Sequence, residues 1–446
     1  MVLGRILKKG MDKMSLKNNK EKLIFNKDFQ DAYDLLENSK EQIIYITGEA
    51  GTGKSTLLRH FREKTKKQLI VLAPTGVAAL NVEAKTIHSF FWFPHKFIQQ
   101  HDIKKHQKIS KLLGCADAVV IDEVSMVRAD LMDAIDYSMR LNLGKMNLPF
   151  GGKRVILFGD MYQLPPVVEN SLVSAFSEVY PSPYFFDAKV FNSISAVYFE
   201  LTSIYRQKDP SFIQLLNKIR NGILGVEDLA VLNQRVTSVM IEDSNNPVVL
   251  TSTNAIADRI NEDKLEALKS EEYYYEAEIS GSFRHDKKYP VEFDLKLKEG
   301  AQVMLVRNDP AGRWVNGTMG KIKRLLDQAI EVTIGSSTYK VKEVVWEEID
   351  YTYDPSTKRI ETEVTGTFKQ YPLKLAWAIT IHKSQGKTFD NMVLTLGNGA
   401  FAHGQVYVAL SRCRTLEGIS LIGSIRHEDL IFDEQAVQYK SKFKKV

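Results

Sequence analysis

Short runs of apolar and β-branched residues alternate with longer segments of helical spacing through the first half of the chain. Runs that are apolar throughout are typical of parallel strands covered by helices on both faces. The predicted strands are residues 42–47, 69–73, 119–122, 154–158 and 197–201, with a predicted helix over 54–67. This order of strand and helix predicts a doubly wound α/β sheet.

A second set of buried runs follows at residues 248–251, 377–380, 392–396 and 419–422, and it predicts a second α/β domain. Between residues 276 and 371 the spacing changes to alternating apolar and polar positions. Strands are predicted there at 302–306, 320–325, 330–334 and 339–346, with turns at Asn316-Gly317 and Asp354-Pro355. We therefore expect a small β-barrel or sheet inserted into the second α/β domain.

Length and charge add limits to this picture. The chain has 446 residues, enough for two to four domains, and 60 basic against 55 acidic side chains give a net charge of +5. That charge permits a polyanionic partner without requiring one. Cys115 and Cys413 are too few and too far apart for a disulfide framework or a zinc site, so we expect a reducing compartment. Residues 1–22 are predicted to form a poorly ordered basic tail.

The strongest chemical signal is the segment GEAGTGKS at residues 48–55, which matches the phosphate-binding loop G-x-x-x-x-G-K-[ST]. At average residue frequencies such a match is expected in only about 2 of 100 chains of this length. A predicted strand precedes it and a predicted helix follows. Backbone N–H groups of such a loop surround the β-phosphate, Lys54 reaches the β and γ oxygens, and Ser55 ligates Mg²⁺. ATP and Mg²⁺ are the predicted cofactors, and the alternative is a glycine-rich turn before an ordinary helix.

A magnesium nucleotide also needs an acidic partner at the end of another strand. Asp122 is the last residue of the predicted strand at 119–122, and Glu123 follows it directly. We predict that Asp122 holds Mg²⁺ through water and that Glu123 accepts the proton of the attacking water. Two such carboxylates are common at strand ends, but beside a phosphate loop they indicate hydrolysis rather than nucleotide storage.

Further motifs carry a resemblance to a known family. They are VSMV at 124–127, DLM at 130–132, GDMYQLPPV at 159–167, TIHKSQG at 380–386 and YVALSR at 407–412. In this order they resemble the motifs of superfamily 1 DNA helicases. The segment from VSMV to DLMD resembles the signature of the PIF (petite integration frequency) family, which are relatives of RecD that move from 5′ to 3′. The resemblance extends from about residue 25 to about residue 422.

The resemblance implies roles for individual residues. Gln30 would recognise the adenine edge, and Gln163 would sense the γ-phosphate and couple it to DNA. Gly386 would bring backbone close to the γ-phosphate. The alternative for Gln30 is a solvated helix residue, and for Gln163 a loop residue before a Pro-Pro turn. The predicted ATP-binding residues are Gln30, Gly48, Gly51, Thr52, Gly53, Lys54, Ser55, Thr56 and Gly386.

Arg206 and Arg412 would be arginine fingers from the second domain. Phosphoryl transfer spreads negative charge over the γ oxygens, and a cation delivered across a cleft stabilises it. The alternative for each arginine is a surface ion pair, and Arg414 is close enough in sequence to be confused with Arg412. The predicted catalytic residues are Lys54, Asp122, Glu123, Gln163, Arg206 and Arg412, and the predicted metal ligands are Ser55 and Asp122.

Hydroxyl groups, imidazoles and backbone amides can hold DNA phosphates without recognising sequence. The predicted DNA-binding residues are Thr75, Gly76, Asn81, Thr86, His88, Phe90, Pro165, Thr380, His382, Lys383 and Ser384. Helix caps and packing residues are the alternative for these positions. The aromatic-rich run at residues 90–97 could stack on bases or form a strand-separating wedge, or it could belong to the core.

The resemblance implies two RecA-like parallel-sheet P-loop domains with an SH3-like β-barrel inserted in the second. The predicted domains are 23–200 with a wedge-like insertion near 88–112, then 201–275 together with 371–446, and the inserted domain 276–370. An SH3-like fold by itself does not indicate a function.

The implied activity is ATP-dependent 5′-to-3′ unwinding of DNA, in replication, repair, recombination or telomere maintenance. The expected partners are single-stranded DNA and tailed or forked duplex DNA, with G-quadruplexes and RNA–DNA hybrids as further candidates. We expect a monomer without a membrane partner, cytoplasmic and nucleoid-associated in a bacterium, or nuclear or mitochondrial in a eukaryote. The alternative is a nucleic-acid-stimulated translocase or a nucleotide switch that does not unwind.

Overall fold

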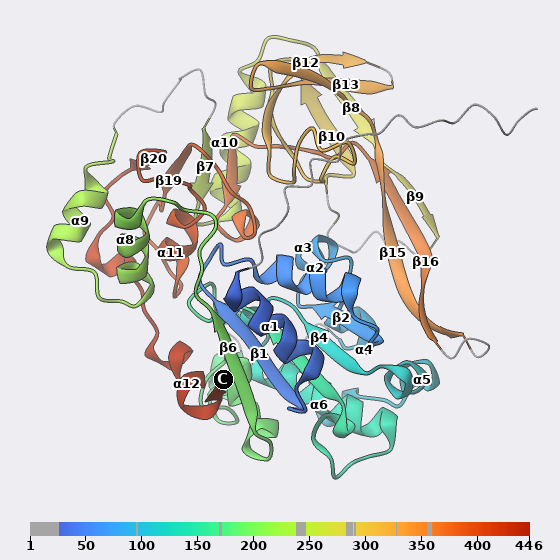
Figure 1. The fold of residues 1–446 in the computed structure, drawn as a ribbon. Coiled ribbons are helices and arrows are strands. Elements are labelled where there is room, and N and C mark those ends of the chain that lie inside the picture. The colour runs from blue at the N-terminus through green and yellow to red at the C-terminus, as the bar shows by residue number, and fades with distance from the viewer. Residues whose placement is uncertain are drawn as a thin grey trace, which may run out of the picture.

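The computed structural model describes residues 26–94, 97–168, 172–237, 247–281, 289, 291–326, 328–354 and 359–446 (Figure 1). The predicted basic tail 1–22, the start of the resemblance near residue 25, and His95 and Lys96 of the aromatic-rich run lie outside these residues. So does the side chain of Asn81. Within the described ranges, no helix is long and apolar enough to cross a membrane.

The first α/β unit is built on a parallel sheet of seven strands in the order β21-β6-β1-β5-β4-β2-β3. Its strands are β1 (Ile43–Gly48), β2 (Leu69–Ala73), β3 (Lys85–Thr86), β4 (Ala118–Ile121), β5 (Arg154–Phe158), β6 (Ala196–Leu201) and β21 (Lys444–Lys445). The strands predicted in the first half are β1, β2, β4, β5 and β6, so the α/β prediction is confirmed. β3 and β21 have two residues each, too few to leave a pattern in the sequence.

Helices cover both faces of this sheet because alternate residues of each central strand point to opposite sides. Ile44 and Ile46 of β1 pack in the core beneath α1 (Lys27–Asn38) and α2 (Lys54–Lys64). Ile43 and Tyr45 pack in the core on the other face, beneath α5 (Gln107–Cys115) and α6 (Ala129–Leu143). The shorter helices of this unit are α3 (Gly76–Asn81), α4 (Ile87–Phe91) and α7 (Val173–Ser177).

The second α/β unit has a parallel sheet in the order β18-β7-β19-β20. Its strands are β7 (Val248–Thr251), β18 (Ala378–Thr380), β19 (Met392–Thr395) and β20 (Ile419–Ile422). Its helices are α8 (Pro210–Arg220), α9 (Val226–Asn233), α10 (Asn254–Glu266) and α11 (Gln405–Leu410). Phe212, Leu215 and Leu216 of α8 share a core with β7 and β19.

Antiparallel strands follow α10, as the alternating pattern predicts. A five-stranded sheet has the order β14-β13-β12-β11-β17, and smaller sheets have the orders β10-β8 and β15-β16-β9. The strands are β8 (Glu272–Glu276), β9 (Glu278–Gly281), β10 (Asp294–Lys298), β11 (Gln302–Leu305), β12 (Met319–Leu326), β13 (Ala329–Ile334), β14 (Ser337–Val341), β15 (Val344–Asp354), β16 (Arg359–Gln370) and β17 (Leu373–Leu375). The strand predicted at 339–346 is interrupted between β14 and β15. The SH3-like class of this insertion stays a prediction.

The hairpin of β15 and β16 extends from the inserted sheets to the first α/β unit (Figure 1). Near its far end, the Tyr351 hydroxyl accepts a hydrogen bond from the backbone N–H of Val71, 3.2 Å away, and the ring lies in the core of the first unit. Lys85 and Lys108 both form ion pairs with Asp350, at 2.6 and 2.7 Å. The inserted region therefore contacts both α/β units.

The C-terminal segment differs from the predicted domain boundaries. The sequence predicts that residues 371–446 belong to the second α/β domain, but β21 pairs with β6 of the first sheet. Tyr439 of α12 (Tyr439–Lys442) and Phe443 are buried in the core of the first unit. In Figure 1 the C-terminus lies beside β6. The chain therefore crosses back and links the two units a second time.

Short 3₁₀ helices connect these elements. They are η1 (Gln100–Asp102), η2 (Val124–Met126), η3 (Pro149–Gly152), η5 (Phe185–Asp187), η6 (Lys189–Asn192), η7 (His382–Ser384), η8 (His427–Asp429) and η9 (Glu434–Val437).

Candidate nucleotide and nucleic-acid site

The phosphate loop connects the end of β1 to the start of α2, and two of its glycines sit where no larger residue fits. Gly48 has φ +147°, and a Cβ there would lie 2.5 Å from the carbonyl oxygen of Leu201. Gly51 has φ +88°, and its Cβ would lie 2.7 Å from the Cβ of Arg206. Atoms of Leu201 and Arg206 lie too close to these positions to leave room for a Cβ, and the backbone at Gly51 is also left-handed. Both facts account for glycine here.

Lys54 is the first residue of α2, and its ammonium points back into the loop. It donates hydrogen bonds to the carbonyl oxygens of Gly48 and Glu49, at 2.8 and 3.0 Å. Burial lowers the pKa of Lys54, while the nearby carboxylates of Asp160 and Glu123 act in the opposite direction. A half-buried cation held at the mouth of a glycine loop can bind phosphate oxygens.

The acidic pair lies at the carboxyl end of β4, where the sequence predicted it. Burial raises the pKa of Asp122, and the charge of Glu123 adds to that effect. Burial also raises the pKa of Glu123, against the attraction of Lys54 and Arg412. Asp122 is buried and Glu123 is half-buried, and two adjacent carboxylates in such surroundings are costly near neutral pH unless cations approach them.

The donors available to a metal fit magnesium. The Ser55 hydroxyl and the Asp122 carboxylate are the hard oxygen ligands that Mg²⁺ uses, with the remainder usually coming from phosphates and water. Across the part of the chain that the structure describes, no group of three or more His, Cys, Asp or Glu side chains could hold an ion by itself. The roles of Ser55 and Asp122 as metal ligands stay predictions. Thr56, next to Ser55, is half-buried.

Gln163 is buried at the boundary of the two α/β units. Its side-chain amide donates to the carboxylate of Asp160 at 3.1 Å. The start of α11 closes over this segment, because a Cβ on Gly404 would lie 2.3 Å from the carbonyl oxygen of Tyr162. His403 also lies 3.1 Å from the carbonyl oxygen of Met161. The predicted sensor residue is thus enclosed by groups from the second unit.

Arg206 and Arg412 converge beside this segment. Arg206 donates to the carbonyl oxygen of Ser411 at 3.1 Å, and Arg412 donates to the hydroxyl of Ser411 at 2.8 Å. Burial lowers the pKa of both arginines, and the charge of Arg412 lowers that of Arg206 further. A buried and a half-buried guanidinium group that repel each other favour an anion between them. Arg414, the alternative finger, has a side chain that is 61% exposed and paired with Asp390 at 3.3 Å.

Two tyrosines beside the loop were not singled out by the sequence. Tyr205 donates its backbone N–H to the carbonyl oxygen of Gly51 at 2.9 Å, and its ring carbons lie 3.9 Å from where a Cβ on Gly53 would be. Its side chain is large and apolar, yet Tyr205 is 52% exposed. Tyr407 is buried and accepts a hydrogen bond from the N–H of Ala50 at 3.0 Å. Tyr205 directly precedes Arg206, and Tyr407 begins the YVALSR motif that ends at Arg412, so each lies in a motif that the sequence already marked.

Gln30 lies on the exposed side of α1, and its amide donates to Asp34 at 3.1 Å. The start of this helix is fixed by Asn26, whose side chain accepts from the N–H of Phe29 at 2.9 Å and donates to Ser203 at 2.5 Å. Residue 203 is close in sequence to Arg206. The role of Gln30 in recognising adenine stays a prediction, as does that of Gly386, which has φ +76°.

Several predicted DNA contacts have side chains engaged in local turns. The Thr75 hydroxyl accepts from the N–H of Ala78 at 3.2 Å, and that of Thr86 caps α4 through the N–H of Ser89 at 3.2 Å. The buried hydroxyl of Thr380 accepts from the N–H of Lys383 at 3.2 Å. The buried hydroxyl of Ser384 donates to the carbonyl oxygen of Ile381 at 2.7 Å. Gly76 and Lys383 are exposed, and His88, Pro165 and His382 are partly exposed.

The aromatic-rich run is divided between core and surface. Phe90, Phe91 and Phe93 are buried in the core of the first unit, so the ring of Phe90 is a packing group and not a surface for DNA. Trp92 has φ +60°, is 57% exposed, and lies 4.4 Å from the ring of His106 between centroids. Of the described residues in this run, Trp92 is the ring available for stacking on a base.

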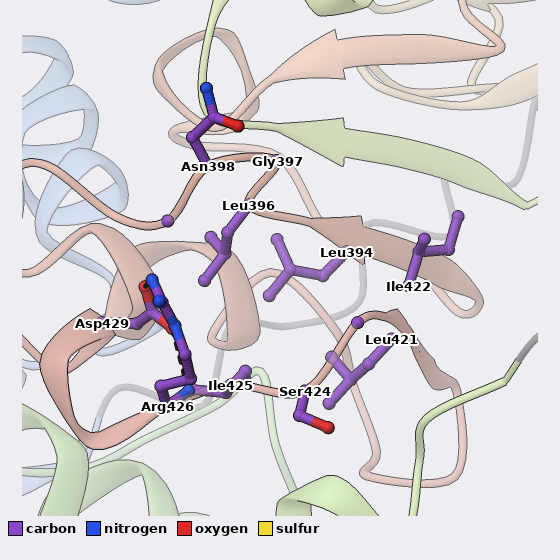
Figure 2. Close-up of a pocket in the computed structure, with 12 residues that line it drawn as sticks. Leu394, Leu396, Gly397, Asn398, Leu421, Ile422, Ser424, Ile425, Arg426 and Asp429 are labelled. Atoms are coloured by element: carbon purple, nitrogen blue, oxygen red, sulfur yellow. Dashed lines mark hydrogen bonds and ion pairs between the residues drawn. The ribbon is translucent and has the colours of Figure 1, made fainter.

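A separate hollow of about 310 Å³ opens at the carboxyl ends of β19 and β20 (Figure 2). Leu394, Leu396 and Leu421 form part of its lining, and Arg426 at its edge donates to Asp429 at 3.2 Å. None of the described residues that line it is a predicted site residue. Because its charged groups are already paired with each other, it is not the nucleotide site.

Comparisons with known proteins agree with the motifs. Residues 18–228 match the family described as PIF1-like helicase, and residues 286–325 match the family described as DNA helicase Pif1, 2B domain. The ATP-dependent DNA helicase Pif1 of Bdellovibrio bacteriovorus is 32% identical, over 92% of this chain and 90% of that protein. The ATP-dependent DNA helicase PIF1 of Mus musculus is 34% identical, over 86% of this chain but 58% of that protein.

Solved structures of Pif1 are also similar to this chain. Unliganded Pif1 from Bacteroides sp has 36% sequence identity and a TM-score of 0.85, covering 94% of this chain and 96% of that one. Its complex with ADP-AlF4 has 36% identity and a TM-score of 0.86, with the same coverage. Bacteroides Pif1 bound to single-stranded DNA has 37% identity and a TM-score of 0.69, again with 94% and 96% coverage.

Proposed function

Because this chain belongs to the PIF1-like helicase family and is an ATP-dependent DNA helicase, we propose that it moves 5′ to 3′ on single-stranded DNA and unwinds the duplex ahead. The observation that carries this proposal is the composition of the nucleotide site. Lys54 and Glu123 come from the first α/β unit, and Arg412 comes from the second. Hydrolysis at such a site depends on how the two units are arranged, which is what a motor requires.

Each residue near the loop has a proposed step. Lys54 leaves the carbonyl oxygens of Gly48 and Glu49 to bind the phosphates, and Ser55 and Asp122 would hold a magnesium ion. The ion, when bound, neutralises charge on the phosphate oxygens. Glu123 accepts the proton of the attacking water. Its raised pKa from burial is lowered by Lys54 and Arg412, so approach of these cations makes it a carboxylate able to accept a proton.

The two arginines make ATP hydrolysis depend on closure of the two units around the nucleotide. Arg206 and Arg412 stabilise the charge on the γ oxygens in the transition state, and the anion relieves the repulsion between them. Gln163 senses the γ-phosphate. Thr52 and the three glycines of the loop contribute backbone N–H groups, and Gln30 binds adenine.

We propose that single-stranded DNA crosses both α/β units. Backbone groups near Thr75, Gly76, Thr86 and His88 would hold it on the first unit, and His382 and Lys383 on the second. One similar solved structure is described as Bacteroides Pif1 bound to single-stranded DNA, and another as the basis for DNA unwinding at forked duplex DNA by two coordinating Pif1 helicases, which supports this class of partner. Backbone contacts predict an affinity that falls with salt and varies little with base sequence.

We infer the DNA substrates, the cellular processes and the oligomeric state from the family. We propose activity on tailed and forked duplexes, G-quadruplexes and RNA–DNA hybrids, in replication, repair, recombination or telomere maintenance. The inserted sheets would be the SH3-like 2B domain, and the protein would act as a monomer in the compartment that holds the DNA.

Strand displacement on matched duplexes tests the proposal. One duplex carries a 5′ single-stranded tail and the other a 3′ tail of the same sequence, and Lys54→Ala is the control for ATP dependence. We expect displacement from the 5′ tail with ATP and Mg²⁺, and none from the 3′ tail. Preferential displacement from the 3′ tail would refute the direction. Oligo(dT)-stimulated ATP hydrolysis without displacement on either substrate would favour the alternative, a translocase.

A further inference from the structure

Arg220 is the last residue of α8, and its guanidinium is buried where the two α/β units meet. One face of α8 packs in the core of the second unit through Phe212 and Leu216. The side chain of Arg220 is only 5% exposed, and it leaves the helix toward the first unit. A buried arginine needs partners, because an uncompensated buried charge is strongly destabilising.

The stacking partner and both ion-pair partners of this guanidinium belong to the first unit. It stacks on the ring of Tyr162 with 3.7 Å between the guanidinium carbon and the ring centroid. It also forms ion pairs with Asp160 at 3.4 Å and with Glu200 of β6 at 3.6 Å. A planar guanidinium can stack and form ion pairs at once, which an ammonium cannot do.

Asp160 links this contact to the predicted sensor. One carboxylate oxygen faces Arg220 and accepts from the N–H of Tyr162 at 3.2 Å, and the other accepts from the amide of Gln163 at 3.1 Å. When Gln163 turns to a γ-phosphate, Asp160 loses that donor. The negative charge of Asp160 is then compensated mainly by Arg220. The ion pair between Asp160 and Arg220 therefore changes in strength at the end of α8.

Tyr162 is held from a second direction. Its hydroxyl accepts a hydrogen bond from Lys440 of the C-terminal helix α12 at 3.0 Å. The ring is therefore fixed between α8 and the segment that returns to the first sheet. The ring also packs in the core that contains Phe212 and Leu216 of α8, so a displacement of Asp160 and Tyr162 reaches α8 through both the ion pair and the packed ring.

We propose that Arg220 is a positioning residue that couples the Asp160–Gln163 pair of the first unit to helix α8 of the second, so that the state of the nucleotide is transmitted between them. The proposal rests on the proposed function, in which Gln163 senses the γ-phosphate. A simple buried ion pair that only stabilises the fold is the competing explanation.

The test compares Arg220→Met with Lys218→Met. Methionine keeps the apolar stem of Arg220 and removes the charge and the flat head. Lys218 lies on the same helix, but its ion pair at 2.7 Å is with Asp228 of the second unit. For each variant the melting temperature, ATP turnover with and without saturating oligo(dT), and displacement of a 5′-tailed duplex are measured.

We expect Arg220→Met to lower the ratio of stimulated to basal turnover by about ten-fold, within the usual 5- to 150-fold range of coupling between sites. Displacement should fall with it, and Lys218→Met should keep the wild-type ratio. A changed melting temperature with an unchanged ratio in Arg220→Met would overturn the proposal in favour of the structural explanation. An equal loss of the ratio in Lys218→Met would also overturn it.

Arg220→Lys keeps the test decisive where the methionine variant does not fold. It keeps the charge without the stacked plane, so we expect a reduced ratio, and a wild-type ratio would overturn the proposal. Asp160→Asn combined with either Arg220 variant should cost no more coupling than one change alone, and additive losses would overturn it. Absence of oligo(dT) stimulation in the wild-type protein would instead contradict the proposed function.

Discussion

The backbone N–H of Ala50, inside the phosphate loop, donates a hydrogen bond to the hydroxyl of Tyr407, 3.0 Å away. The two residues are 357 positions apart, and Tyr407 lies on α11, the helix that precedes Arg412. The loop that would bind phosphate and the segment that would stabilise the transition state are thus in direct contact. Movement of the second unit changes the geometry of both.

Arg412→Ala should depress ATP turnover by about 100-fold or more at saturating ATP and DNA, the scale for losing one group that stabilises transition-state charge. The guanidinium is buried beside Arg206 and within the influence of Glu123. Steady-state hydrolysis measures the effect, and a thermal melt checks that the variant is folded.

Arg414→Ala is the matched control, because its exposed ion pair with Asp390 contributes little to stability and faces solvent. We expect wild-type turnover from it. Loss of turnover in Arg414→Ala together with normal turnover in Arg412→Ala would exchange the two assignments.

Lys54→Ala should abolish most ATP hydrolysis while leaving single-stranded DNA binding intact. The ammonium is replaced by a methyl group, so the charge-assisted contact with the phosphates is lost, and the proposed DNA contacts lie elsewhere. Hydrolysis and fluorescence anisotropy with oligo(dT), the latter in the absence of nucleotide, measure the two properties. Retention of more than a tenth of wild-type hydrolysis would contradict the phosphate-loop assignment.

Glu123→Gln should separate nucleotide binding from chemistry. The amide keeps the shape of the side chain but cannot accept the proton, so turnover should fall about 10²-fold, the usual scale for a general base. Binding of a fluorescent ATP analogue should persist. Because burial raises the pKa of Glu123 in the wild-type protein, the neutral glutamine should also be tolerated by the fold. An ATP turnover close to wild type would assign the proton acceptor to another group.

The sequence was sufficient for the elements whose signal is local. The five runs that became β1, β2, β4, β5 and β6 are mostly apolar and buried because both faces of the sheet are covered. The phosphate loop can be recognised from the spacing of its residues alone. The structure explains that spacing, because Gly48 and Gly51 have no room for a side chain. Such features depend on neighbouring residues and therefore leave a readable pattern.

Long-range polar contacts left no such pattern. Asp350 pairs with Lys85 and Lys108, and Arg220 meets Asp160, although each partner looks like an ordinary charged residue in sequence. The return of the chain as β21 rests on two lysines, which do not resemble a strand. The fate of the aromatic-rich run also depended on burial, which placed Phe90 in the core and Trp92 at the surface.

Tyr205→Ala should weaken ATP binding more than it slows chemistry. The ring is exposed at the edge of the phosphate loop, beside Gly53, where it can stack on the base of a nucleotide whose phosphates occupy the loop. Loss of base–aromatic stacking costs about 1–3 kcal/mol, so we expect the KM for ATP to rise while kcat changes little.

Tyr205→Phe keeps the ring and should behave as wild type, which separates stacking from any hydrogen bond of the hydroxyl. A second comparison uses inorganic triphosphate as a competitor, which lacks a base. Because it cannot stack, its inhibition constant should be the same for the wild-type protein and for Tyr205→Ala. An equal weakening of triphosphate and ATP would mean that Tyr205 supports the loop through its backbone contact with Gly51 and does not hold the base.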